Sequence, residues 1–490
     1  MSIIESQSSP DLSIEQRDTP EETYIARAAT FARARDEYDA RGTRNANLNV
    51  ALFFGALVSV GVAAFGDLPI FFGVAALLFG GFIAAFSRLG RLNRLRRRYY
   101  ILWQINDEGP KRLRRQWSDL PLREPGATPA DHPYAADLDL TGHASLQHLL
   151  ATTSTPAGQA TLQQWLLAPA SIATVRERQT AVAELAPQID LRDELALRGR
   201  LVSTSQDAYE RFLTWAEATP WLLRQPWLIW LTRALPILTV AAAIAQLVHL
   251  TTAPIWLAFI VINGMLTWLY GGTLNGLLDQ VSDRQSAFQP YADLFQLVET
   301  QRFEAPALRR VQDTLARDQL RASEQMQRLA RIMQYGDVRL SMFFPVLQAV
   351  TLWNFHVLWF LERWQRTAGP YARDWLATLS EVEALSALAT LAYDNPTWAF
   401  PDLSESSGPD AILTARNLGH PLLPPATCVG NDVTIGPPGT FLLVTGSNMS
   451  GKSTLLRAIG VNVVLAQAGA PVCASALRLP PIELATSIRV

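Results

Sequence analysis

The chain has 490 residues, which is enough for about three domains and excludes a single small domain. Lysine and arginine (42) nearly balance aspartate and glutamate (44), which argues against a globally basic nucleic-acid-binding protein. With 49% hydrophobic and 18% charged residues, the chain is too apolar for a disordered protein, and a membrane component is indicated. Cys428 and Cys473 are too few for a disulfide framework or a zinc site, so they are interpreted as small core residues in a reducing compartment.

The N-terminal region, residues 1–47, is predicted to be a polar tail followed by an amphipathic helix. Residues 1–18 are rich in serine and acidic residues and show no signal-peptide pattern. The sequence Thr19-Pro20-Glu21-Glu22 then supplies an N-cap, a proline at the first helical position and an acid at the third. These residues predict a helix that runs towards Ala40.

Two uncharged stretches predict a transmembrane hairpin over residues 48–87. Asn45–Gly66 and Leu68–Ser87 each supply about 20 residues, which at 1.5 Å per residue cover the roughly 30 Å hydrocarbon core of a bilayer. Only Asp67 separates the two stretches, so both outer ends of the hairpin should lie on one side of the membrane.

The next segment, residues 88–140, begins with a strongly basic block. Nine arginines and Lys111 lie between Arg88 and Gln116, against Asp107 and Glu108. Such a block beside a membrane span marks the cytoplasmic face and can attract anionic lipid. A grip on nucleic-acid phosphates is the less favoured interpretation of the same arginines.

A second uncharged stretch, Ala234–Leu278, predicts a further transmembrane hairpin within residues 227–270. Its apolar halves, Leu235–Leu250 and Ile255–Tyr270, are each short for a full crossing. Residues Trp227–Leu231 can lengthen the first half if the Arg233 side chain reaches with its charge to the membrane interface. We therefore expect four crossings in all, with both termini cytoplasmic in a multi-pass protein of the cell (inner) membrane.

The third apolar run, Ser341–Leu361, is long enough to cross but contains Pro345, Gln348 and Asn354. It is predicted to be a buried helix of a soluble domain, because a fifth crossing would place the C-terminal nucleotide site on the side opposite the basic block. The surrounding residues 271–405 show the three-and-four spacing of apolar residues that is typical of long helices.

Residues 406–490 contain the motif that carries chemistry. The apolar run Phe441–Thr445 predicts a strand, the spacing G-x-x-x-x-G-K-S follows it completely, and a helix is predicted from Leu455. Backbone N–H groups of such a loop, with the N-terminus of the following helix, bind phosphates. Lys452 is predicted to contact the β- and γ-phosphates, and Ser453 to be a ligand of Mg²⁺.

The predicted cofactors are therefore ATP and Mg²⁺. The predicted nucleotide-binding residues are Gly446, Ser447, Asn448, Met449, Ser450, Gly451, Lys452, Ser453 and Thr454. Lys452 and Lys111 are the only lysines in the sequence, which strengthens the interpretation of Lys452.

The loop Thr445–Lys452, TGSNMSGK, resembles the TG-x-NM-x-GKS loop of the MutS family of ATPases, the family of DNA mismatch repair. His420–Leu423 and Asn431-Asp432 resemble the HPLL and ND elements that precede this loop in the family. Ser145–Val182 looks like the start of the MutS core domain, and Glu383–Ala389 is similar to the helix that returns from the levers. The matching residues in the first of these segments include Thr155, Gly158, Trp165 and Arg178.

This resemblance divides the rest of the chain. It implies a first part of the core at residues 141–226, a helical core and lever at residues 271–405, and the first half of a P-loop ATPase domain at residues 406–490. The hairpins look like those of a membrane-anchored MutS-related branch. The resemblance also implies a homodimer through the ATPase domain where that domain is complete, and an association with DNA by family likeness alone.

Several residues depart from the family pattern. The family's Phe-x-Glu mismatch wedge is spelled only by Phe360-Leu361-Glu362, which ends an apolar helical run and is interpreted as structural. Cys428 stands where family members can place an aromatic residue against adenine. Thr454–Val490 has no aspartate and only Glu483 as an acid, so no Walker B element is expected before the predicted strand Ala485–Val490.

The sequence thus predicts a mainly α fold with an incomplete C-terminal α/β P-loop domain and two transmembrane helical hairpins. The leading function is a membrane-anchored MutS-like ATP-binding protein, in which these 490 residues bind Mg-ATP without turning it over and bind DNA weakly, without preference for a mismatch. Whether the protein is an enzyme stays open. The alternative is a non-enzymatic membrane scaffold or a truncated product, with a vestigial phosphate loop.

Overall fold

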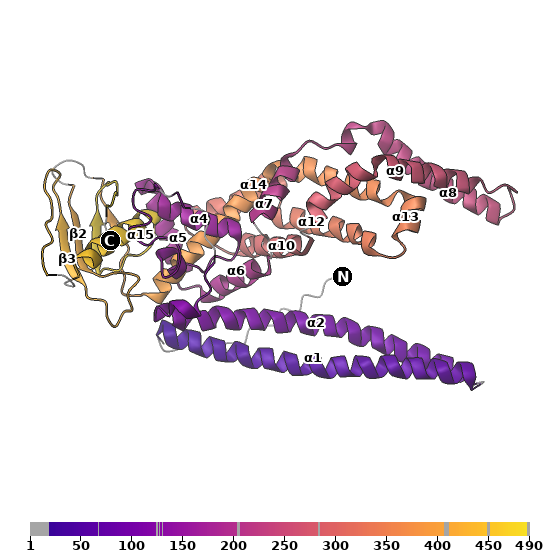
Figure 1. Cartoon of the computed structure of the whole chain (residues 1–490), viewed down its shortest axis with the longest axis horizontal. Helices are drawn as coiled ribbons and strands as arrows, with labels where there is room; N and C mark the ends of the chain where they lie inside the picture. The colour runs from indigo at the N-terminus through magenta and orange to yellow at the C-terminus, as the bar shows by residue number, and fades with distance from the viewer. Residues whose placement is uncertain are drawn as a thin grey trace. The chain divides into compact units, whose positions relative to one another are not determined.

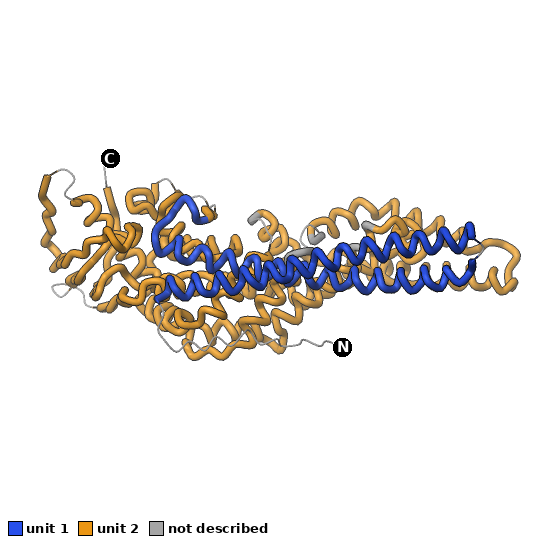
Figure 2. Tube along the Cα trace, turned by 90° about the horizontal axis from the view of Figure 1, so that it is seen from below, with its two compact units in different colours: residues 1–120 blue, residues 121–490 orange. Residues whose placement is uncertain are grey.

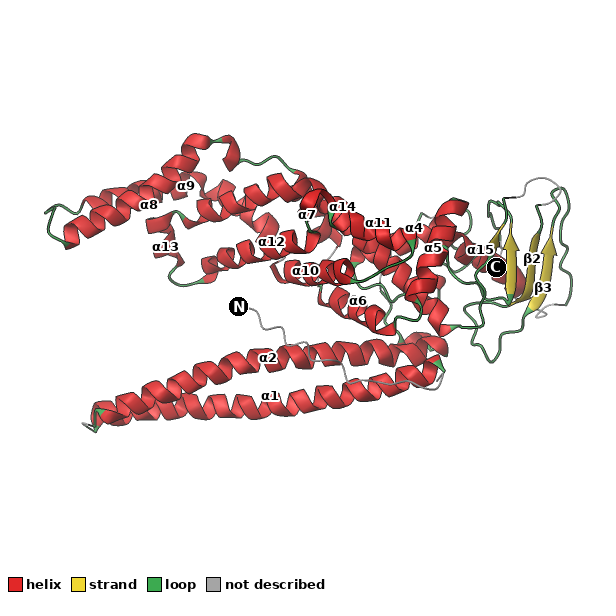
Figure 3. Ribbon diagram, turned by 180° about the vertical axis from the view of Figure 1, so that it is seen from behind, coloured by secondary structure: helices red, strands yellow, loops and turns green. Residues whose placement is uncertain are grey.

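The computed structural model describes residues 19–66, 68–123, 126, 128–129, 131–202, 206–282, 285–405, 411–447 and 451–487. The chain forms two compact units, residues 1–120 and 121–490, which are shown in blue and orange in Figure 2. Helices predominate in both, and the strands gather near the C-terminus (Figures 1 and 3). The predicted polar tail of residues 1–18 and the turn residue Asp67 lie outside the described residues.

Unit 1 is a hairpin of two long helices, α1 (Pro20–Phe65) and α2 (Ile70–Leu113), followed by the short helix η1 (Trp117–Asp119). The predicted capping signature is formed: the Thr19 hydroxyl accepts a hydrogen bond from Glu22 N at 3.3 Å, and Glu22 Oε2 accepts one from Thr19 N at 2.9 Å. The predicted amphipathic helix and the first apolar span are one continuous helix, because α1 contains no proline after its first residue.

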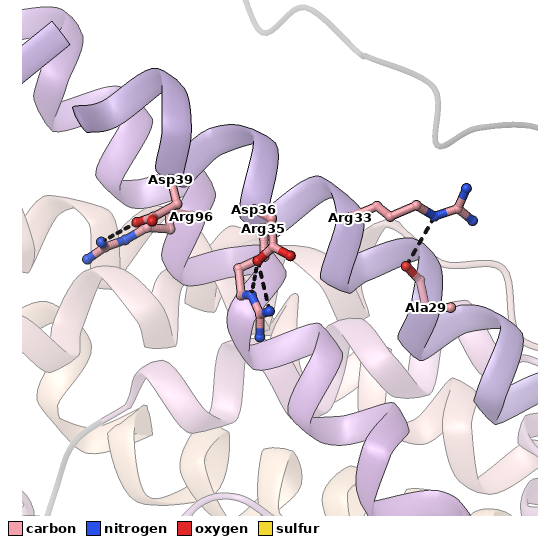
Figure 4. A network of polar contacts seen from close by, with 6 residues as sticks. All are labelled: Ala29, Arg33, Arg35, Asp36, Asp39 and Arg96. Carbon is pink, nitrogen blue, oxygen red and sulfur yellow. Dashed lines mark hydrogen bonds and ion pairs between the residues drawn. The ribbon is translucent and has the colours of Figure 1, made fainter. Parts of the chain in front are cut away.

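Polar pairs join α1 to α2 between the base of the hairpin and Asn45. Arg96 Nη1 lies 2.8 Å from Asp39 Oδ1, as Figure 4 shows beside the pair Arg35 and Asp36 within α1. Nearer the base of the hairpin, Arg27 Nε donates to Asn106 Oδ1 at 3.2 Å. In the apolar part, Asn45 Nδ2 donates to the Ala85 carbonyl at 2.7 Å. Some arginines of the basic block therefore bind α1 itself and hold the hairpin together.

Unit 2 is built around α14 (Trp353–Asp394), which is 42 residues long. The other helices of this unit are α3 (Leu146–Leu149), α4 (Pro156–Leu167), α5 (Ile172–Leu185), α6 (Ile189–Leu201), α7 (Gln206–Glu217), η2 (Leu222–Arg224), α8 (Pro226–Leu247), α9 (Ile255–Ser282), α10 (Gln285–Thr300), α11 (Pro306–Leu315), η3 (Arg317–Gln319), α12 (Ala322–Gly336), η4 (Asp337–Leu340) and α13 (Phe344–Thr351). Helices α4, α5, α7, α11 and α12 all pack on α14, so its buried side chains form the centre of the helical core.

Four helices of the described residues are long and apolar enough to cross a membrane: α1, α2, α8 and α9. Helices α8 and α9 are longer than the apolar halves from which the second hairpin was predicted. Helix α8 begins at Pro226, before the first predicted half, and α9 continues to Ser282, beyond the second. The residues that each helix adds contain no proline after Pro226, which is at the first helical position. The bent pair α13 and α14 would add a fifth candidate if it counts as one span.

The prediction of one buried helix over Ser341–Leu361 is wrong. The run is broken at Leu352, which has a left-handed φ of 53°, and α13 and α14 meet there at 75°. Polar side chains satisfy the broken backbone: Asn263 Nδ2 donates to the Ala349 carbonyl at 2.8 Å, and Gln348 Oε1 accepts from Asn354 N at 3.0 Å. The polar residues that the sequence shows inside this run therefore hold a break.

The two helical segments that resemble the MutS core meet at Glu383 of α14. Its Oε1 accepts hydrogen bonds from Ser154 N and Thr155 N, both at 3.1 Å, just before α4 begins. Thr155 in turn caps α4 by accepting from Gly158 N at 3.0 Å. A Cβ on Gly158 would lie 2.5 Å from Glu383 Oε2, so only glycine allows this close approach.

The C-terminal part combines a four-stranded sheet with α15 (Lys452–Ala468). The strands are β1 (Asp402–Leu403), β2 (Leu413–Leu418), β3 (Asn431–Ile435) and β4 (Ala476–Leu479), in the order β1-β4-β2-β3. β1 and β4 are parallel, and β2 is antiparallel to both β3 and β4.

Two predicted strands are not formed in the described residues. Phe441–Thr445 is not a strand, and none of the four strands, which lie in the order β1-β4-β2-β3, pairs with it. Residues 485–487 are also not a strand, and residues 488–490 lie outside the described residues. A β-strand needs a paired neighbour for its backbone groups, and neither segment has one here.

Candidate functional site

The predicted phosphate loop leads directly into α15. Gly451 is the N-cap of this helix and has a φ of 83°, a conformation that side-chain-bearing residues rarely adopt. Ser453 and Thr454 follow in the first turn, and both are exposed. The first N–H groups of a helix carry partial positive charge, so this end of α15 can receive an anion. Of the predicted site residues, Asn448, Met449 and Ser450 lie outside the described residues.

Lys452 reaches back across the loop. Its ammonium group donates to the carbonyl oxygens of Gly446 at 2.7 Å and of Ser447 at 2.5 Å. The positive charge is thus held at the mouth of the loop by neutral acceptors, which an anionic phosphate oxygen would outcompete.

A cavity of about 540 Å³ opens beside this loop. This size falls within the roughly 300–1,000 Å³ that small-molecule sites occupy. It is lined by Leu418, His420, Leu423, Thr427, Val429, Asn431, Val444, Thr445, Gly446, Gly451, Lys452, Thr454, Leu455 and Ala458. The structure therefore brings together residues of the predicted phosphate loop with His420 and Asn431 of the two preceding elements, while Ser447 and Ser453 do not line the cavity.

His420 forms a neutral polar part of the cavity wall. Burial lowers its pKa, the charge of Arg457 lowers it further, and Asp139 raises it. Its Nδ1 accepts a hydrogen bond from Leu422 N at 3.3 Å. An imidazole with a lowered pKa is uncharged at neutral pH, so His420 offers hydrogen bonds to a ligand and adds no charge.

Apolar side chains form another part of the cavity lining. Val429 is 76% exposed and Leu423 is 37% exposed, and both line the cavity. Between them in the chain, Cys428 directs its Sγ towards the His420 carbonyl at 3.7 Å. A flat apolar ligand group can lie against these side chains, although the described lining contains no aromatic ring apart from the imidazole of His420.

Asn462 is a structural residue of this site that the sequence analysis missed. It is buried in α15, where its Nδ2 donates to the carbonyls of Gly419 at 2.9 Å and of Ala458 at 2.8 Å. Its Oδ1 accepts from Cys473 N at 2.6 Å. The signal was present in the sequence, since Asn462 is a lone amide inside the apolar run Val461–Ala466.

The residues present fit a nucleotide phosphate and a hard divalent cation. Lys452, the N–H groups at the start of α15 and the cavity fit the phosphate, and the exposed Ser453 hydroxyl has the oxygen chemistry that Mg²⁺ prefers. In the part of the chain that the structure describes, no group of three or more histidine, cysteine or acidic side chains is placed to hold a metal ion.

Comparison with known proteins gives one family for this region. Residues 442–488 match MutS domain V. The chain is 36% identical over 122 residues to the DNA mismatch repair protein MSH6 of Arabidopsis thaliana, covering 22% of this chain and 9% of that protein. It is 38% identical over 122 residues to the DNA mismatch repair protein MutS of Azorhizobium caulinodans, covering 23% and 13%. It is 43% identical over 106 residues to MutS 1 of Halobacterium salinarum, covering 21% and 12%. The matched part is thus about a tenth of the length of each relative.

Proposed function

We propose, on the premise that these C-terminal matches support membership of the MutS family, that this chain is a membrane-anchored MutS-like ATP-binding protein. The observation that carries the proposal is the position of Lys452. Its ammonium group lies at the start of α15, beside a cavity of about 540 Å³ that is large enough for a nucleotide.

The chain's own residues would bind the nucleotide as follows. Lys452 exchanges the carbonyls of Gly446 and Ser447 for phosphate oxygens, and the first N–H groups of α15 add hydrogen bonds to the same phosphates. The apolar side chains of Leu423 and Val429 pack against the base. Mg²⁺, when bound, supplies positive charge that neutralises the phosphates, with the Ser453 hydroxyl as its ligand from this chain.

The far end of α15 connects the cavity to the helical core. Arg178 of α5 donates to the carbonyl of Ala468, the last residue of α15, at 3.4 Å. Its guanidinium carbon also lies 3.6 Å from the ring centroid of Trp165 in α4. Helices α4 and α5 both pack on α14. A shift of α15 on nucleotide binding therefore has a contiguous route to the long central helix, which supports a role in which ATP rearranges the levers.

The membrane and partner assignments belong to the same proposal. The four long apolar helices support a multi-pass anchor in the cell inner membrane, with the phosphate loop on the cytoplasmic side. Homodimer formation through the ATPase domain and association with DNA are proposed from the mismatch repair relatives. The second candidate function is a non-enzymatic membrane scaffold with a vestigial phosphate loop that does not bind ATP, favoured by the unpaired segment Phe441–Thr445 behind the loop.

Binding of ATP by the purified full chain in detergent tests the proposal. Lys452→Ala should weaken Mg-ATP binding by about tenfold or more, because a charge-assisted hydrogen bond to phosphate contributes roughly 1.5–3 kcal/mol. Lys111→Ala is the matched control, since this lysine is paired with Asp107 at 2.5 Å in unit 1. If the wild type and Lys452→Ala melt at the same temperature and bind ATP equally, the loop is vestigial and the scaffold is favoured.

A further inference from the structure

The two cysteines of the chain lie together although they are far apart in the sequence. A Cβ on Gly419 would lie 2.5 Å from Cys428 Sγ and 3.0 Å from Cys473 Sγ. Both sulfur atoms therefore face the same small space, which is available to them only because residue 419 has no side chain. Neither cysteine is part of a disulfide in the structure.

Hydrogen bonds fix the backbone on both sides of this space. Gly419 N donates to the Cys473 carbonyl at 2.7 Å, and Cys428 N donates to the Pro424 carbonyl at 3.1 Å. Asn462 binds the Gly419 carbonyl and Cys473 N at the same time, so α15 holds both chain segments. The backbone that carries the two thiols is thus held in place beside Gly419. Both cysteines are partly exposed to solvent.

We propose that Cys428 and Cys473 form a redox-reactive dithiol that a hydroperoxide converts into an intramolecular disulfide. The thiolate of one cysteine attacks the peroxide oxygen, which forms a sulfenic acid and releases water or an alcohol. The thiol of the other cysteine then attacks the sulfenic sulfur, forms the S–S bond and releases water. The two thiols together lose two electrons and two protons, and the peroxide is reduced. In a reducing compartment such a bond is transient and serves as a sensor.

The cysteine pair lies next to residues that line the cavity, so a disulfide between them would act on the cavity wall. Thr427 and Val429, on either side of Cys428, line the cavity beside the predicted phosphate loop, as does His420 next to Gly419. Drawing the sulfurs together over Gly419 displaces these wall residues. The effect on the cavity rests on the proposed nucleotide binding, and we expect oxidation to weaken ATP binding by about fivefold or more.

Because the sequence contains only two cysteines, thiol counting tests the dithiol directly. The purified full chain should carry two reactive thiols before hydrogen peroxide and none after it. Mass spectrometry should find the peptides of Cys428 and Cys473 joined, and dithiothreitol should restore both thiols. Cys428→Ser and Cys473→Ser, each with one thiol left, should instead give a sulfenic acid that a dimedone probe captures. Independent oxidation of both cysteines to sulfinic acids, or a disulfide between two molecules only, would overturn the proposal.

Titration of ATP into the reduced and the oxidised chain is a separate measurement. A disulfide without any change in ATP affinity refutes the effect on the cavity. A chain that forms the disulfide but binds no ATP in either state refutes the proposed function and leaves the dithiol established. Cys428→Ser should bind ATP equally before and after peroxide, which excludes damage at other residues.

Discussion

Glu383 is a carboxyl group that lies in the core and holds two distant segments together. Burial raises its pKa, whereas hydrogen bonds from Thr155 and Ser154 and the charge of Arg123 lower it, and the net effect is a raised pKa. The folded protein therefore binds this proton more tightly than the unfolded chain does. The corresponding contribution to stability is fully present below the ordinary pKa of 4.5 and is lost as the pH rises through the raised value.

We predict that the melting temperature of the detergent-purified chain decreases as the pH rises above 4.5, in part because of Glu383. Glu383→Gln keeps an oxygen that can accept from Ser154 N and Thr155 N but has no proton to lose, so it should flatten this dependence. Thermal unfolding across a pH series measures it. Glu324→Gln, at an exposed position of α12, is the control, and equal slopes for both variants would contradict the assignment.

Single residues of the site were predictable where a backbone motif defines them. The spacing of Gly446, Gly451 and Lys452 predicted that these residues lie together at the start of a helix, because all of them belong to one short stretch of the sequence. Gly419 and Asn462 were not predicted, because their roles depend on Cys428 and Cys473, which are brought to them by the fold. A residue whose partners come from distant segments carries little signal in its own neighbourhood.

At the scale of elements, the break between α13 and α14 shows where composition stops being informative. Ser341–Leu361 has the apolar content of one helix, and nothing local marks Leu352 as the residue with a left-handed φ. The break depends on α9, whose Asn263 binds the Ala349 carbonyl and whose Thr267 hydroxyl accepts from Gln348 Nε2 at 3.1 Å. Side-chain amides and hydroxyls on an apolar helix can form hydrogen bonds to the backbone groups that a break in the neighbouring helix leaves unpaired. Without such partners, those backbone groups would be paired only within a continuous helix.

We therefore predict that Asn263→Leu destabilises the protein by about 1 kcal/mol, the usual net contribution of one hydrogen bond to stability. The variant loses the bonds to the Ala349 carbonyl and to Thr239 Oγ1 at 3.3 Å. Thermal unfolding in detergent gives the stability, and limited proteolysis near Ser341 reports on α13. Met265→Leu, at a position of the same helix that is 67% exposed, should change neither. Equal results for the two variants would mean that the amide does not hold the break.

The predicted strands failed for a related reason. Phe441–Thr445 has the composition of a buried strand, yet Phe441 is 85% exposed and Leu443 is 72% exposed. The helix after the loop was predicted correctly from Leu455 onwards because a helix satisfies its own backbone. A strand depends on neighbours that its own sequence does not contain.

At the scale of the whole molecule, the four long apolar helices and the basic block permit a specific topology. Each of the pairs α1–α2 and α8–α9 is joined by a short connection, so a pair that crosses a membrane would return to the side from which it entered. Arg96 binds Asp39, but the block between Arg88 and Gln116 keeps its excess of positive charge. Positive charge close to membrane spans remains on the cytoplasmic side.

We predict four crossings with both termini in the cytoplasm. An alkaline phosphatase fusion after Asp67 should be active, and fusions after Gln116 and after Trp364 should be inactive, because the reporter folds only outside the cytoplasm. Fluorescent protein fusions at the same three positions should show the complementary pattern. Activity after Trp364 would mean that α13 and α14 together cross the membrane, and activity after Gln116 would invert the first hairpin.

The bond between Thr155 and Glu383 also sets an order of events while the chain is being made. The two residues are 228 positions apart, and at roughly 5–20 residues per second the ribosome needs about 10–50 s to pass from one to the other. During that interval α4 has emerged without the carboxyl group that binds its first backbone groups, and both helices α8 and α9 have been synthesised. The helical core around α14 therefore closes only after α8 and α9 have left the ribosome, so a pause in their synthesis would extend the time in which the first half of the core is unfinished.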